Sequence, residues 1–204
     1  MPAYVWKGKT RDGKERPMTL GTGAVLTVAY DPDLVSISLT DRAGVPLYWQ
    51  TVQSGFDNTA PTKAETAGLE VFREYVDAEG KVVTSAKRGQ ALTAVVKVRS
   101  LGRNAVGNVA VVDLLPGGLE LALDKSSNRP FHELILGNMV RDSGEAREDR
   151  VLVFGEAGTK LTEFRYPVKA VTAGTFVLPV VQAEAMYDRT VHARTASGTF
   201  IVTE

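Results

Sequence analysis

The sequence contains no cysteine among its 204 residues, and this absence removes several classes of chemistry. Disulfide bonds, thiolate nucleophiles, and zinc or iron–sulfur sites built on sulfur are all excluded. The absence does not identify a compartment, because a chain without cysteine is compatible with reducing and with oxidising surroundings.

An excess of charge of one sign and a long apolar run are also missing. The 24 Lys and Arg residues balance the 24 Asp and Glu residues, and no basic stripe stands out. We therefore predict no nucleic acid partner. No segment approaches the length of a membrane-spanning helix, and the first residues do not form a signal peptide. Membrane association is thus expected only through an anchor outside this chain.

Histidine is scarce, with only His132 and His192 present. Neither residue lies in a cluster with metal-ligand spacing or near a serine in a nucleophile elbow, so we interpret both as surface or packing residues. No set of nucleophile, base and orienting residue is visible elsewhere. The sequence therefore predicts no catalytic residue, no metal site and no cofactor, and the chain is not expected to be an enzyme.

Short strand-like runs punctuated by turn signals make up most of the chain. In the N-terminal part they lie at residues 4–7, 24–30, 34–40 and 47–52, and Asp12-Gly13 is a strong hairpin signal. In the C-terminal part the clearest runs are 69–76, 91–99, 108–115 and 176–181. This pattern predicts an all-β fold of two tandem antiparallel β-sandwich domains, immunoglobulin-like or macroglobulin-like.

A polar, turn-rich stretch at residues 54–68 is interpreted as the linker, which gives domains at 1–62 and 63–204. The first domain has fewer runs than the seven or so strands of a typical immunoglobulin-like sandwich, so it is expected to be incomplete. Residues 124–150 are interpreted as a long polar loop, in which 131–136 form a short helix or an edge strand. A final hairpin is expected with Ser197-Gly198 at its turn.

The stretch 182–194 connects two strand-like runs near the C-terminus and presents Met186 and Tyr187 at one end of a sheet. A flexible thioether beside an amphipathic ring suits a surface that covers a reactive group of a partner and excludes water from it. The alternative is that the pair caps the core of its own domain. Both interpretations stay open at this point.

The order of motifs around this stretch resembles the C-terminal end of the bacterial alpha-2-macroglobulins. The resemblance rests on residues 165–176, the step Leu178-Pro179 and residues 184–188, and the segments 112–120 and 143–150 upstream fit the same pattern. It covers residues 68–203 well and residues 4–61 more loosely.

This resemblance implies a C-terminal, non-catalytic fragment of a broad-spectrum protease inhibitor. In the family, the last domain packs against the thioester domain of the same chain, and a Met-Tyr pair shields the thioester from water. That role maps onto Met186 and Tyr187, although this chain has no Cys-Gln thioester sequence of its own. The resemblance further implies a periplasmic parent anchored to the inner membrane as a lipoprotein. Its partners would be the trapped proteases and, in envelope repair, a penicillin-binding protein.

A different class of protein remains as the alternative, an immunoglobulin-like repeat module of a bacterial surface adhesin or stalk. Residues 113–119 also resemble a common surface-repeat motif. A tandem of the same repeat upstream would favour the stalk, whereas a helical thioester domain and a bait region upstream would favour the macroglobulin.

Overall fold

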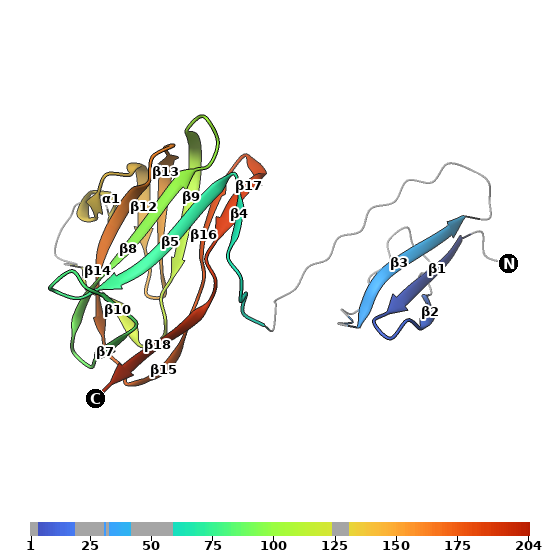
Figure 1. Cartoon of the computed structure of the whole chain (residues 1–204), viewed down its shortest axis with the longest axis horizontal. Helices are drawn as coiled ribbons and strands as arrows, with labels where there is room; N and C mark the ends of the chain where they lie inside the picture. The colour runs from blue at the N-terminus through green and yellow to red at the C-terminus, as the bar shows by residue number, and fades with distance from the viewer. Residues whose placement is uncertain (1–3, 19–30, 32, 42–58, 124–130) are drawn as a thin grey trace. The chain divides into compact units, whose positions relative to one another are not determined.

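The computed structural model describes residues 4–18, 31, 33–41, 59–123 and 131–204. The chain divides into two compact units, Met1–Asn58 and Thr59–Glu204 (Figure 1). The division falls four residues before the domain boundary expected from the sequence. No helix in the described ranges is long and apolar enough to cross a membrane.

The described part of the first unit is an antiparallel sheet with the strand order β2-β1-β3. Its strands are β1 (Tyr4–Thr10), β2 (Glu15–Met18) and β3 (Leu34–Asp41). β1 and β2 form the predicted hairpin, and Gly13 in its turn has φ +84°, a value that glycine adopts without strain. The predicted strands at 24–30 and 47–52 lie outside the described residues.

The second unit is a β-sandwich whose two main sheets face each other across one core. The first sheet has the order β10-β14-β8-β5-β6, with β11 also on β14, and the second has the order β12-β13-β9-β16-β17-β4. Strands of the first are β5 (Leu69–Val76), β6 (Val82–Val83), β8 (Ala91–Ser100), β10 (Leu119–Leu121), β11 (Leu136–Gly137) and β14 (Thr162–Ala170). Those of the second are β4 (Glu65–Ala67), β9 (Val106–Leu114), β12 (Val140–Ala146), β13 (Arg150–Ala157), β16 (Val181–Ala185) and β17 (Asp188–Arg194).

Two smaller elements complete this unit. A third sheet has the order β15-β18-β7, built from β7 (Ser85–Lys87), β15 (Gly174–Leu178) and β18 (Gly198–Thr203). The helix α1 (Phe131–Leu134) lies beside β12. The all-β prediction is therefore confirmed for the second unit.

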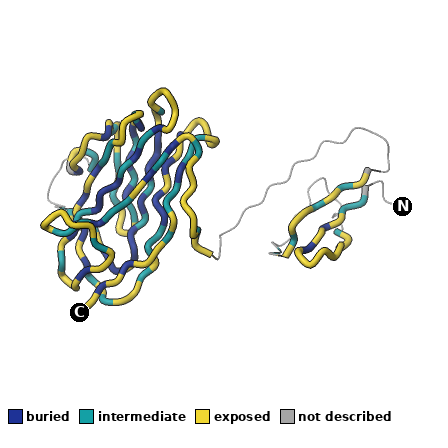
Figure 2. The backbone as a smooth tube through the Cα atoms, viewed as in Figure 1, coloured by how far each residue is buried: buried dark blue, intermediate teal, exposed yellow. Residues whose placement is uncertain are grey.

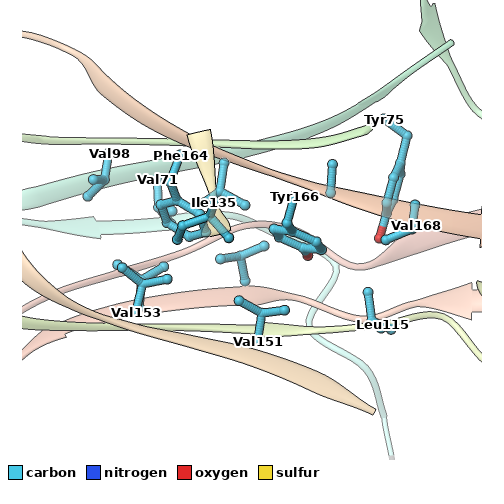
Figure 3. Packing of buried hydrophobic residues seen from close by; sticks show 14 of the residues in the cluster. Val71, Tyr75, Val98, Leu115, Ile135, Val151, Val153, Phe164, Tyr166 and Val168 are labelled. Atoms are coloured by element: carbon cyan, nitrogen blue, oxygen red, sulfur yellow. The ribbon is translucent and has the colours of Figure 1, made fainter. Parts of the chain in front are cut away.

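The core follows from alternation along the strands. In β14 and β16, buried and exposed residues alternate, as expected when one face of a strand meets the core and the other meets water (Figure 2). Inward-facing valines of β8, β9 and β13 pack in one core with the rings of Phe164 and Tyr166. Figure 3 shows both rings with several of these valines, among them Val98, Val151 and Val153. The core is thus built from residues far apart in the sequence.

One buried ion pair crosses this apolar core. The Arg73 guanidinium on β5 binds the Asp113 carboxylate on β9, with side chains 3% and 0% exposed. Arg73 also donates to the carbonyl oxygens of Leu114 (3.0 Å) and Pro179 (2.6 Å), and the Tyr166 hydroxyl donates to Asp113 (2.5 Å). Burial and the nearby Asp113 carboxylate raise the pKa of Tyr166 well above its usual value, so this hydroxyl stays a donor. The network joins the two main sheets.

Three sequence predictions were wrong in detail. The predicted loop at 124–150 contains the strand β12, which pairs with β13. Within it, the short helix expected for 131–136 does form, as α1, and it is followed by β11. The predicted linker contains β4, which pairs with β17. The expected final hairpin does not form, because β17 and β18 belong to different sheets and β18 pairs with β15 and β7. Short polar strands, and pairings between strands far apart in the chain, give no clear hydrophobic pattern in the local sequence.

The ion pair generates a stability prediction. Asp113→Asn removes the charge that balances buried Arg73, and we expect it to lower the free energy of unfolding by about 3–5 kcal/mol. Glu74→Gln, on the same strand as Arg73, is the matched control. Its partner Lys97 is 28% exposed and Glu74 39% exposed, so the loss should be about 0–1 kcal/mol.

The measurement is urea unfolding of the 204-residue chain, followed by the methyl NMR signals of core valines in the second unit. Equal losses for the two substitutions would show that the buried pair does not tie the sheets together.

Candidate functional site

The candidate site is the tip of the β16–β17 hairpin. Ala185 pairs with Asp188, which leaves Met186 and Tyr187 as the two residues of the loop. Met186 is 42% exposed and Tyr187 is 85% exposed, large values for apolar and aromatic side chains. Neither has the positive φ of the Asn-Gly turns that usually close such hairpins. The two-residue tip therefore exposes two large side chains, where such a turn usually carries small residues.

The base of the hairpin is fixed in the core. Val181, Ala183 and Ala185 point inward from β16 and are almost fully buried. At the other end of the hairpin, the amide of Val181 donates to the Thr195 hydroxyl (2.9 Å), and the amide of Thr195 donates to the Val181 carbonyl (3.0 Å). The exposed tip thus stands on a rigid support, as a contact site needs.

The β17 side of the tip contains a bulge. Glu184 pairs with His192 while Ala185 pairs with Asp188, so the residues 189–191 have no partner on β16. The Asp188 carboxylate closes this bulge by accepting hydrogen bonds from the Thr190 hydroxyl (2.6 Å) and amide (3.0 Å). These two bonds hold the pKa of Asp188 below its usual value.

His192 connects the bulge to the edge strand β4. Its Nδ1 donates to the carbonyl oxygen of Arg189 (3.0 Å), and its Nε2 faces the Glu65 carboxylate (3.3 Å). Arg194 also pairs with Glu65, at 3.0 Å. These contacts give His192 a structural role, because it joins the bulge of β17 to the edge strand β4. The described residues contain no group of three or more His, Cys, Asp or Glu side chains placed to hold a metal ion.

The β9 side of the tip is held by a backbone contact. The amide of Met186 donates to the carbonyl oxygen of Asn108 at 2.9 Å. Asn108 has φ +53° and is the one non-glycine residue with positive φ in the part of the chain that the structure describes. The tip is therefore bordered by an irregular backbone segment on each side.

The structure places Met186 and Tyr187 in the loop at one end of a sheet, which is the position that the sequence indicated. Their exposure does not support the alternative in which the pair caps the core of its own domain. The sequence interpretation missed Asp188 and Thr190, although an Asp followed two residues later by Thr is a recognisable turn signal. It also missed Asn108, which is the first residue of a run predicted as a regular strand.

Comparison with known proteins gives consistent matches. The model of the bacterial alpha-2-macroglobulin MG10 domain matches residues 68–189. An alpha-2-macroglobulin homolog of Yersinia pestis is 34% identical over an alignment of 176 residues that covers 78% of this chain and 9% of the relative. The structure of a point mutant of Salmonella alpha-2-macroglobulin matches with a TM-score of 0.67 and 25% identity, covering 98% of this chain and 13% of that one.

A second Salmonella alpha-2-macroglobulin structure, of the protein reacted with methylamine, shares the fold. Its TM-score is 0.62 at 21% identity, covering 98% of this chain and 13% of that one. The chain spans about a tenth of the length of the curated relatives it matches. Of the two classes expected from the sequence, these matches favour the macroglobulin over the adhesin or stalk.

The bulge generates a prediction for the pKa of Asp188. In Thr190→Val the hydroxyl donor is lost, and we expect the pKa to rise towards its usual value of 3.8, whereas Thr190→Ser retains the donor and the lowered pKa. Because the folded-state pKa is lowered, ionised Asp188 stabilises the hairpin above its unfolded-state pKa, and this contribution disappears as pH falls through the folded-state value. In Thr190→Val this pH-dependent contribution should become smaller, because the folded-state pKa lies closer to the unfolded-state pKa.

The measurement is a carboxyl-carbon NMR titration of Asp188 in the two variants and the parent chain. An identical titration in Thr190→Val and the parent would mean that the hydroxyl does not hold the bulge closed.

Proposed function

The chain belongs to the bacterial alpha-2-macroglobulin family, and on that premise we propose that it is a C-terminal, non-catalytic part of a longer protein that traps proteases. Two observations support this role. The matched MG10 model covers residues 68–189, most of the second unit, and the chain corresponds to a small share of each relative. The bait region and thioester domain of such a trap would therefore lie elsewhere in the longer protein, and this part acts as a scaffold.

The mechanism that we propose for the scaffold is contact between the Met186-Tyr187 tip and the thioester domain. The observation that carries it is the exposure of these two large side chains on a hairpin whose base is buried. Adjacent exposed apolar groups on a rigid support are typical of contact surfaces. A thioether and a phenol ring can adapt to a partner surface while excluding water from it.

The chemistry explains why exclusion of water matters. Water attacking a thioester forms a bond to the carbonyl carbon, breaks the carbon–sulfur bond and releases a thiol and a carboxylic acid. An amine such as methylamine gives an amide and the same thiol, and the Salmonella relative has been solved after reaction with methylamine. A cover of apolar atoms over the thioester slows both reactions until the cover moves.

The location and the further partners are proposed from the resemblance to the family alone. We place the longer protein in the periplasm, held at the inner membrane by a lipoprotein anchor outside this chain. Proteases that cleave its bait region would be its targets, and a penicillin-binding protein its partner in envelope repair. Cell fractionation and co-purification test these two points independently of the tip.

The test of the tip uses the full-length protein that carries this chain. We expect methylamine to release thiol from it, and Tyr187→Ala to release thiol about tenfold faster, or without methylamine, because water reaches the thioester. Thiol is measured with a chromogenic disulfide reagent. Phe72→Ala is the matched control, since Phe72 is also an exposed aromatic, at 43%, but lies on the strand β5 of the other main sheet.

Two results would contradict the proposal. Absence of thiol in every variant would mean that the longer protein has no intact thioester, so that the tip is a structural contact only. Equal acceleration by Tyr187→Ala and Phe72→Ala would assign the effect to general loosening rather than to the tip.

A further inference from the structure

The last backbone hydrogen bond between β9 and the tip is made by an unusual residue. Ala185 pairs with Val109, and the next contact along the ladder is the bond from the Met186 amide to the Asn108 carbonyl at 2.9 Å. Asn108 has φ +53°, in the left-handed region that side chains with a Cβ disfavour and that Asn tolerates better than most. The direction of this carbonyl therefore depends on which residue occupies position 108.

A bulge in β9 accounts for this conformation. Gly155 on β13 pairs with Val109, and Ala157 pairs with Val106, so Gly107 and Asn108 together oppose the single residue Glu156. Such a bulge places two residues against one, bends the strand and redirects backbone groups. Here it turns the Asn108 carbonyl to β16, at the point where β16 enters its loop.

We propose that Asn108 is the positioning residue for the Met186-Tyr187 tip. Its left-handed backbone holds the carbonyl that fixes the Met186 amide, and this sets the direction in which the two side chains leave the sheet. The role rests on the proposed function of the tip, because correct placement matters only if the tip covers a partner surface.

The surroundings of Asn108 distinguish this role from ordinary stabilisation. Its side chain is exposed, whereas the next residue, Val109, is fully buried in the core. Replacing Asn108 therefore removes little buried surface and should leave the fold intact. The effect of a substitution is expected at the tip and not across the sandwich.

The first experiment measures amide hydrogen exchange by NMR in the 204-residue chain. In Asn108→Val, a β-branched side chain opposes the left-handed conformation, and exchange of the Met186 amide should become about tenfold faster. Asn108→Gly retains the conformation and should leave the exchange unchanged. Asn108→Ala, a milder change than Val, serves if Asn108→Val does not fold.

Gly107→Ala is the matched control, because it lies in the same bulge and a Cβ there meets no atom within 4 Å. Exchange of the Ala183 amide, deeper in the hairpin, should stay constant in all variants. Unchanged Met186 exchange in Asn108→Val, or an equal rise in Gly107→Ala, would overturn the assignment of Asn108.

The second experiment measures thiol release from the full-length protein with Asn108→Val, Asn108→Gly and Tyr187→Ala. We expect faster release in Asn108→Val and wild-type release in Asn108→Gly. If Tyr187→Ala has no effect, the proposed function of the tip fails. The backbone contact between Asn108 and Met186 is then tested by the exchange data alone. If Tyr187→Ala accelerates release while Asn108→Val frees the Met186 amide without accelerating it, the positioning role fails and the function of the tip stands.

Discussion

The sandwich depends on the buried ion pair between Arg73 and Asp113. It is a charged contact across an otherwise apolar core, and it joins β5 of one main sheet to β9 of the other. A buried charge is costly unless every polar group is satisfied, and here Tyr166, Leu114 and Pro179 provide the remaining partners. Sliding one sheet past the other would leave these groups unpaired. The network therefore favours one relative placement of the sheets.

The same network contacts the segment that leads into the β16–β17 hairpin. Pro179, whose carbonyl accepts from Arg73, lies between β15 and β16, where the chain passes from the third sheet to the second main sheet. Two residues later, Val181 begins β16, which ends at Ala185, immediately before Met186. The core network thus fixes the base of the hairpin, and the bulges of β9 and β17 fix its tip. Rigidity at both ends is what allows an exposed pair of side chains to act as a defined surface.

The sequence predicted the parts of this arrangement that local pattern encodes. Alternation placed the long strands. It did not lead to a prediction that Arg73 lies on the core face, although residues 69, 71, 73 and 75 of β5 share one side. It cannot name Asp113 as the partner, because the pairing depends on how two distant sheets stack. The strands β4 and β12 were missed because they are short or polar. The left-handed conformation of Asn108 was missed because a bulge is set by the neighbouring strand.

The position of β4 has a mechanical consequence. The chain that arrives from the first unit enters the second at β4, and this edge strand pairs with β17 of the functional hairpin and connects to it through Glu65. Tension along the chain from the N-terminal side would therefore load this short edge pairing before any core strand. The base of the β16–β17 hairpin, where Arg194 pairs with Glu65, would be the first part of that hairpin to experience a pull that originates elsewhere in a longer protein. In this fold, the point of covalent attachment lies beside the base of the hairpin that carries the contact residues at its tip.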